Sequence, residues 1–424
     1  MADFDLSTTI SPYLDRHLVF PLLEFLQSQE LYDMRDILEA KIELLKKTNM
    51  VDFAMDIYRA LNETDDVPEE MLKIRAEVVS TLRRLEGEAR TIMSFLQDPN
   101  NVRNLRQDKA MNQKYLAEQY QIGPEQIESL YQFARCQYQC GNYGSAAELL
   151  QSYRLLCTNA DRSLSALWGR FAANVLLQNF DAANDDLTKL KEALENQSFI
   201  SPLLQLQQRT WLMHWALFVF WNHKNGVNNI IDLFLQEERY LNALQTNAPH
   251  LLRYIAAAVI INIRRRSMLK ELVRVIEQEA YEYSDPITDF IDCLYIKHDF
   301  DGAQKKLVKC AELLENDYFL AGFKDDFLEN ARLAIFETYC RIHQTIDIKT
   351  MSQKLDMDDD TAEKWVVNLI RNEKLDARVD SRAGTVVMRV QPPNVFEQII
   401  DRTRDLSIRT FRLANDVVSG KATA

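Results

Sequence analysis

The 424-residue chain has few glycines and few prolines, with 10 of each. Average usage near 7% would give about 30 glycines in a chain of this length. We therefore expect long, uninterrupted helices. The sequence also lacks the glycine-rich phosphate-binding motifs of nucleotide enzymes and the G-x-S-x-G motif of serine hydrolases. These absences favour a helical protein that is not an enzyme and needs no cofactor.

Metal-binding and disulfide patterns are missing as well. The six cysteines show no C-x-x-C spacing, and the six histidines show no H-x-x-x-H spacing. Cys136 and Cys140 are four residues apart, which could hold a metal, but without a nearby histidine core packing is the simpler interpretation. A catalytic Cys–His pair would need a convergence in space that the sequence does not indicate. We expect reduced thiols, as in a cytoplasmic or nuclear protein.

Long apolar segments and a strong positive charge are also absent. The longest apolar run, Trp211–Trp221, is interrupted by His214 and is shorter than the roughly 20 residues that span a bilayer. The first ten residues lack the basic start and apolar centre of a targeting peptide. We therefore expect no membrane contact. The net charge of −13 opposes general attraction to nucleic acid, so an RNA contact would need a local basic patch.

The sequence does contain helical periodicity. It begins in an N-terminal region, which we place at residues 1–106. Pro21 predicts a helix start, because proline fits the first helical position. Further along, apolar residues recur at steps of three and four, which predicts one long amphipathic helix or a coiled-coil arm. This series consists of Met71, Ile74, Val78, Leu82, Leu85, Ala89, Ile92 and Leu96.

A short pattern recurs within residues 107–330. The sequence [Asn/Asp]-[Phe/Tyr]-x-x-Ala begins at Asn142, Asn179 and Asp299, each time between two helical stripes. The aromatic residue would pack at the turn, and the alanine would let two helices approach. The first two copies are 37 residues apart, close to the period of about 34 residues in helical hairpins. We predict a right-handed helical-repeat solenoid, with about three more hairpins before the third copy.

The pattern changes within residues 331–390. After a helix, residues 346–348 alternate like a strand, and two helical stripes follow, the second over Thr361–Lys374. Alternation in residues 375–380 and 385–388 then predicts a β-hairpin. This order of elements is that of a winged helix. Thr361–Lys374 carries both acidic and basic side chains, so protein binding is favoured over DNA reading.

Three further stretches are candidate contact sites. An amphipathic helix follows Pro392-Pro393, within a tail at residues 391–424, and has no apparent partner in the chain. The aromatic stretch around Trp211, Trp215 and Phe218 predicts solenoid core rather than a partner anchor. The densest cluster of basic residues is predicted to be a solvated turn. The alternative is a docking patch for RNA or an acidic partner. This cluster consists of Arg264, Arg265, Arg266, Lys270 and Arg274.

A helical solenoid followed by a winged helix resembles the PCI domain. Proteins of the proteasome lid, the COP9 signalosome and eukaryotic initiation factor 3 share this domain. Several segments narrow the resemblance to one family within the initiation factor, that of its e-type subunits, and they extend over nearly the whole chain. These segments are Asp15–Leu26, Thr48–Met55, Leu206–Leu212, Asn229–Leu235, Tyr240–Ala243, Asp299–Leu307 and Trp365–Asn372.

The resemblance implies a non-catalytic scaffold that supports assembly of the factor and recruitment of mRNA to the small ribosomal subunit. PCI subunits join through their winged-helix sheets, which implies partner-binding strand residues Ala377, Val379, Thr385, Val386, Val387 and Met388. We expect residues 385–388 to offer an open strand edge. PCI subunits also bundle their C-terminal helices, which implies a second set at Val395, Ile399, Ile400, Leu406, Leu413 and Val417.

The implied partners are other PCI and MPN subunits of the factor, including subunits c and d, and the small ribosomal subunit. The scaffold protein of the cap-binding complex is a further implied partner. A PCI subunit of the proteasome lid or the signalosome would have the same architecture, and co-purification would separate the two assignments. A winged-helix nucleic-acid-binding protein is an alternative of another class, and tight, salt-sensitive binding by the isolated chain would reveal it.

Overall fold

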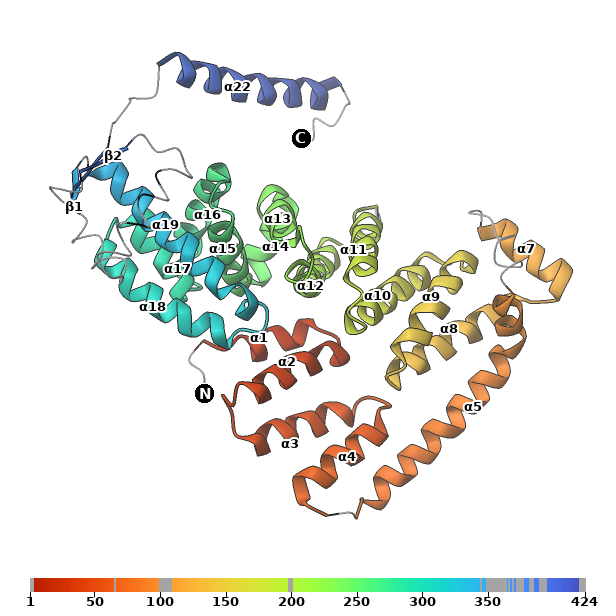
Figure 1. Cartoon of the computed structure of the whole chain (residues 1–424). Helices are drawn as coiled ribbons and strands as arrows, with labels where there is room; N and C mark the ends of the chain where they lie inside the picture. The colour runs from red at the N-terminus through yellow and green to blue at the C-terminus, as the bar shows by residue number, and fades with distance from the viewer. Residues whose placement is uncertain are drawn as a thin grey trace. The chain divides into compact units, whose positions relative to one another are not determined.

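The structure is a computed structural model. It describes residues 4–64, 66–98, 109–196, 201–343, 345–347, 364, 367, 370, 377–380, 385–388 and 395–418. The described chain is mostly helical and forms two compact units, Met1–Ala334 and Ile335–Ala424 (Figure 1).

The first unit begins with helices that precede the solenoid. They are α1 (Ser7–Ile10), η1 (Ser11–Tyr13), α2 (Arg16–Ser28), α3 (Met34–Leu45), α4 (Val51–Asn62), α5 (Glu69–Gln97) and α7 (Lys109–Tyr120). The solenoid hairpins follow. They contain α8 (Pro124–Gln139), α9 (Tyr143–Leu156), α10 (Ala160–Leu176), α11 (Phe180–Glu195), α12 (Pro202–Phe220), α13 (Gly226–Ile231), η2 (Asp232–Gln236), α14 (Glu238–Asn247), η3 (Pro249–Leu251), α15 (Leu252–Ile261), α16 (Arg266–Glu279), α17 (Pro286–Ile291), η4 (Asp292–Ile296), α18 (Phe300–Asn316), η5 (Ala321–Phe323) and α19 (Lys324–Ile342).

Helix α2 begins five residues earlier than the proline predicts. Asp15 is its N-cap, and its side chain accepts a hydrogen bond from the backbone N–H of His17. Pro21 therefore lies inside the helix, so the prediction of a start at Pro21 was wrong. The capping carboxylate decides the boundary here, because it satisfies a backbone donor that would otherwise lack a partner.

The long seam in the N-terminal region forms one helix, α5, as predicted. Its C-terminal half packs against α8, where Leu85, Ala89 and Ile92 are buried in a shared cluster with Leu130. Its N-terminal half is largely exposed, although Met71 and Val78 are half-buried. Packing against α8 therefore makes α5 a part of the first unit.

The recurring motif marks the turns of three helical hairpins. Asn142, Asn179 and Asp299 are the N-caps of α9, α11 and α18. The residue directly before each cap has a positive φ: 90° at Gly141, 59° at Gln178 and 53° at His298. A left-handed residue ends the preceding helix and reverses the chain, so the motif is a turn with a defined backbone geometry.

An N-terminal aromatic residue joins the first helices to the middle of the solenoid. The Tyr13 ring stacks on His214 at 4.3 Å between centroids. The Tyr13 hydroxyl donates to the carbonyl of Asn247 at 3.1 Å, and the Trp215 indole N–H donates to the Tyr13 carbonyl at 3.0 Å. These contacts join residues about two hundred positions apart. Figure 1 shows α1 to α4 beside the solenoid, with α5 running back towards α8.

His214 and His250 form a buried pair beneath Tyr13. Their Nε2 atoms are 2.8 Å apart, and the Nδ1 atom of His214 lies 2.7 Å from the Thr210 carbonyl. The carbonyl can only accept, so His214 carries its proton on Nδ1 and accepts from the Nε2–H group of His250. Burial lowers the pKa of His214 to about 3 and that of His250 to about 4. Both imidazoles are therefore neutral at pH 7.

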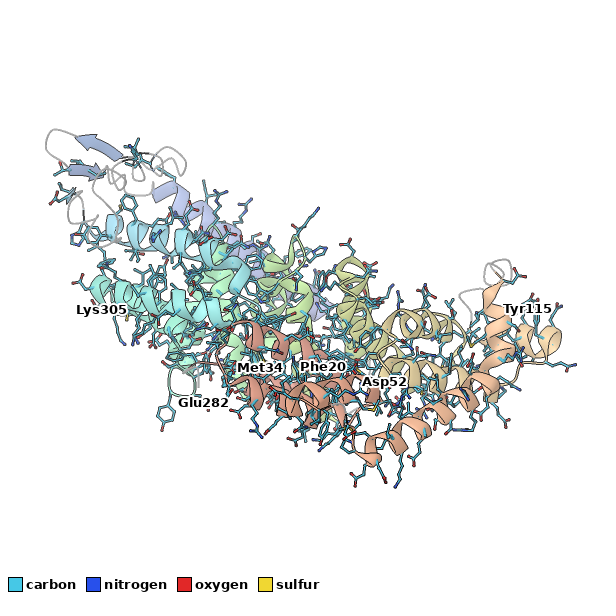
Figure 2. The ribbon with its side chains drawn as sticks, turned by 60° about the horizontal axis from the view of Figure 1, so that its bottom comes forward. Phe20, Met34, Asp52, Tyr115, Glu282 and Lys305 are labelled. Carbon is cyan, nitrogen blue, oxygen red and sulfur yellow. The ribbon has the colours of Figure 1, made fainter. Side chains whose placement is uncertain are left out.

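A buried ionic network fixes the end of the solenoid. Arg253 of α15 is 2% exposed and lies 2.9 Å from Asp285, the N-cap of α17. It also lies 3.2 Å from Asp317, the C-cap of α18. Burial alone would lower the pKa of Arg253, but Tyr283 and the two carboxylates raise it. One guanidinium thus joins three helices. Figure 2 shows Lys305 of α18 and Tyr115 of α7 at opposite ends of this unit.

The second unit contains the part of α19 from Ile335 onward, a three-stranded antiparallel sheet and a C-terminal helix. Its strands are β1 (Thr345–Asp347), β2 (Ala377–Asp380) and β3 (Thr385–Met388), in the order β1-β3-β2, and its last helix is α22 (Val395–Val418). The predicted strands and tail helix are thereby confirmed. Of the predicted helix Thr361–Lys374, residues 364, 367 and 370 are helical and the rest lie outside the described residues.

Candidate interaction surfaces

The position of β3 in the sheet corrects one expectation. Val386 of β3 pairs with Ile346 of β1 and with Val379 of β2. β3 is therefore the central strand, and the prediction that residues 385–388 form an open edge was wrong. The reason is that the short segment at residues 345–347 adds a third strand beside the hairpin. Within the described sheet, β1 and β2 are the outer strands.

The side chains of β3 alternate between the interior and solvent. Val386 is buried, whereas Val387 is 43% exposed and Thr385 is half-buried. Ala377 and Val379 are placed by their backbone register in β2, and Met388 by its register in β3. Only Val387 of this predicted group presents a large apolar side chain to solvent among the side chains that the structure describes.

Helix α22 carries an exposed apolar stripe with the spacing of a coiled-coil seam. Its residues repeat at alternating steps of three and four, with exposed fractions between 55% and 72% for the apolar members. The stripe consists of Phe396, Ile399, Thr403, Leu406, Thr410, Leu413 and Val417. The hydroxyls of Thr403 and Thr410 donate to carbonyls of their own helix, which leaves their methyl groups for packing.

Four of the predicted tail residues, Ile399, Leu406, Leu413 and Val417, lie on this stripe, whereas the side chain of Val395 lies outside the described residues. The sequence interpretation missed two exposed phenylalanines. Ile400 lies beside the stripe and is 62% exposed. Phe396 continues the same spacing towards the N-terminus, and Phe411 lies with Ile408 on another side of the helix. The helical period alone could have identified both phenylalanines. α22 therefore presents apolar side chains on more than one side, as a helix inside a bundle does.

The basic cluster lies at the hairpin turn between α15 and α16. Arg265 is half-buried and forms an ion pair with Asp232 at 2.6 Å. Arg264 and Arg266 are exposed, as are Lys270 and Arg274 on α16. Arg266, Lys270 and Arg274 follow at steps of four, so they lie on one face of α16. The turn is solvated, as predicted, and three of its cations continue along one helix face.

The aromatic stretch and the thiols belong to the interior. Trp215 contacts Trp168 edge-to-face, and Phe218 is buried, which confirms the prediction of solenoid core. Burial raises the pKa of Cys136, and it raises the pKa of Cys140 to about 12. Neither thiol is therefore activated. Within the described residues, no three His, Cys, Asp or Glu side chains form a group that could hold a metal ion.

Comparison with known proteins identifies two domains. The family model for the eIF3 subunit 6 N terminal domain matches residues 5–137, and the PCI domain model matches residues 307–390. The E subunit of eukaryotic translation initiation factor 3 from Arabidopsis thaliana is 53% identical over 98% of this chain and 97% of its own length. The chain belongs to the family of initiation factor 3 E subunits. The proteins of the same name from Bombyx mori and Aspergillus fumigatus are each 47% identical, over 97% and 96% of this chain and 94% and 91% of their own lengths.

Membership of the E-subunit family fits the architecture. The helical solenoid leads into a winged-helix PCI domain, and the helices before the solenoid lie within the match to the N-terminal domain. These matches do not favour a subunit of the proteasome lid or the signalosome. None of the helices in the described part of the chain combines the length and hydropathy needed to cross a bilayer.

Proposed function

We propose that the chain is a non-catalytic scaffold subunit of translation initiation factor 3, and that α22 inserts into a helical bundle formed with other subunits. The exposed heptad stripe of α22 is the observation that supports this most strongly. Membership of the E-subunit family supports the choice of complex. Through assembly of the factor, the protein would support recruitment of mRNA to the small ribosomal subunit.

A helical partner explains the stripe better than a flat one. Alternating steps of three and four place side chains along a seam that another helix fills with its own residues. Burying an exposed leucine or phenylalanine contributes about 1.5–3 kcal/mol. Leu406 and Leu413 occupy equivalent positions in successive heptads, and each is more than 60% exposed. The seam would therefore gain several kcal/mol on assembly.

The outer strands of the winged-helix sheet would supply a second contact. β1 and β2 border the described sheet on its two sides, and a strand edge pairs readily with a neighbouring sheet. The neighbours would be PCI or MPN subunits of the factor, subunits c and d among them. A contact with the scaffold protein of the cap-binding complex would then join the factor to capped mRNA.

The basic face of α16 is the proposed contact with ribosomal RNA. Lys270 and Arg274 are exposed and make no ion pair with any described residue. Reversing both, in the double variant Lys270→Glu/Arg274→Glu, should weaken association with the small ribosomal subunit, most clearly at low salt. If the double variant associates with the ribosome as strongly as the parent across a salt series, this face of α16 does not contact RNA.

Co-assembly of α22 variants tests the main proposal. Leu406→Asp/Leu413→Asp places two charges on the seam and should reduce recovery of the other subunits with the tagged chain. Arg412→Asp is the matched control, because residue 412 is exposed on the polar side of the helix with Asp405, and the change also makes the net charge more negative by two. Full recovery with the double variant would contradict bundling. Equal loss with the control would point to a general charge effect.

A further inference from the structure

A cavity of about 580 Å³ lies where the N-terminal helices meet the solenoid. Its walls come from the start of α2, the turn between α3 and α4, and helices α8 and α10. Cavities that bind small molecules have volumes of roughly 300–1,000 Å³. The size therefore suits a small molecule rather than a folded partner.

The cavity is positively charged, although the chain as a whole is negative. Its lining includes Arg16, Lys47, Arg135 and Arg162, against a single carboxylate, Asp15. Arg162 forms an ion pair with Glu128 at 3.2 Å. The carboxylate of Asp15 already accepts from the Tyr138 hydroxyl at 2.7 Å and from the backbone N–H of His17. His17, which also lines the cavity, has its pKa lowered by burial and adds no charge at neutral pH.

Three of the cations have no acidic partner among the described residues. The guanidinium of Arg16 donates to the backbone carbonyl of Lys47 at 2.5 Å. The side chains of Lys47 and Arg135 form no ion pair or hydrogen bond with any described residue. Arg16, Lys47 and Arg135 are all exposed, so each can reach a ligand. We call these three residues the junction cations.

A side-chain hydrogen bond links two of the elements that carry the junction cations. The Asn49 side-chain amide donates to the side-chain Oε1 of Gln139 at 3.1 Å, which connects the α3–α4 turn to α8. Asn49 follows Lys47 by two residues, and Gln139 lies one helical turn after Arg135. The positive charges of the junction cations repel each other where they line the same cavity. A bound anion would relieve this repulsion and would link the N-terminal helices to the solenoid.

We infer that the junction cations bind a small ligand with two or more adjacent phosphates. Arginine offers a planar pair of donors to phosphate oxygens, and lysine offers a compact charge. Cations from three elements suit several phosphates held close together better than one isolated carboxylate. A long nucleic acid would meet the net charge of −13 outside the cavity. A nucleoside triphosphate and an inorganic polyphosphate share the required chemistry.

Calorimetric titration and thermal unfolding of the full chain test this inference, with ATP and tripolyphosphate as probes. Both probes should bind, raise the unfolding temperature and bind more weakly as salt rises. Lys47→Glu/Arg135→Glu should weaken binding at least about tenfold, because it replaces two attractive charges with repulsive ones. The milder Lys47→Gln/Arg135→Gln should give an intermediate loss. Tighter binding of ATP than of tripolyphosphate would identify a nucleotide, and equal binding would identify the phosphate chain.

The matched control is Lys305→Glu/Lys309→Glu, which changes the net charge equally through two exposed lysines of α18 that do not line this cavity. It should leave probe binding within about twofold of the parent, because surface charges separated by more than about 10 Å are screened. If the control variant weakens probe binding equally, the effect comes from overall net charge and the inference is overturned. No heat and no shift in unfolding temperature with either probe would also overturn it. Tighter binding of a single-stranded RNA, weakened by the junction variant, would assign the cations to nucleic acid instead.

Discussion

The buried histidine pair should make the first unit acid-sensitive. His214 and His250 are neutral in the folded chain, with pKa values lowered to about 3 and about 4 by burial. In the unfolded chain, a histidine titrates near pH 6.5. Below that pH the unfolded state binds protons that the folded state excludes, so the free energy of unfolding falls as the pH falls. The stabilisation is fully present above pH 6.5.

The size of this effect follows from the two pKa shifts. Between the unfolded and folded pKa values, each histidine changes the free energy of unfolding by about 1.4 kcal/mol per pH unit. From pH 7.5 to 4.5 the pair should therefore remove up to about 5 kcal/mol. Domains are typically stable by only about 5–15 kcal/mol. Acid should thus loosen the region where Tyr13 stacks on His214.

His250→Gln isolates one half of the effect. Glutamine retains an N–H donor for His214 but cannot take up a proton in this range. We expect the variant to lose about 1.4 kcal/mol per pH unit of the dependence between pH 6.5 and 4.5. Urea unfolding at a series of pH values, followed by tryptophan fluorescence, measures this, because Trp215 bonds to Tyr13 beside the pair.

An exposed histidine provides the control for this experiment. His298→Gln also removes a histidine, at a left-handed turn position where Gln178 already occupies the equivalent place. Its unfolding profile should run parallel to that of the parent. If His250→Gln also runs parallel to the parent, the buried pair does not couple folding to pH and the reasoning is refuted.

Three further substitutions test the packing. Arg253→Met leaves two carboxylates buried without a cation and should cost about 3–5 kcal/mol in unfolding free energy, against at most about 1 kcal/mol for Arg265→Met in its solvent-accessible ion pair; equal costs would contradict the network. Gly226→Ala should destabilise by about 1–3 kcal/mol, because its Cβ would lie 1.7 Å from a backbone oxygen, whereas Gly144→Ala meets no atom within 4 Å and should be neutral or stabilising. Val387→Pro should expose the second unit to limited proteolysis without changing solenoid fluorescence, because it interrupts the central strand; unchanged protection would argue against the strand order.

The local turn chemistry could be predicted from the sequence. Asn142, Asn179 and Asp299 mark the helix starts. At Asn179 and Asp299 the side chain accepts a hydrogen bond from a backbone N–H of the first turn, which explains why a polar residue stands there. Pro21 was misleading because proline prefers the first helical position, whereas here it lies in the second turn of α2, where it removes a backbone hydrogen bond. The cap at Asp15 was the better signal.

The long-range contacts could not be predicted from the sequence. Tyr13 meets His214 across about two hundred residues, and no local pattern links them. The place of β3 in the sheet likewise depends on pairing with the distant segment at residues 345–347. The junction cations are separated in sequence, so only folding brings Arg16 and Arg135 to one cavity. The stripe of α22, in contrast, is local and follows from helical spacing.

Photo-crosslinking from α22 tests the scaffold role most directly. A photoreactive residue placed at Leu413 lies on the proposed seam, and one at Arg412 lies on the polar side of the helix with Asp405. In the complex assembled in cells, position 413 should crosslink to a helix of another initiation factor 3 subunit, with much less product from position 412. Crosslinks from position 413 that reach only this chain, or none from an assembled complex, would contradict the account.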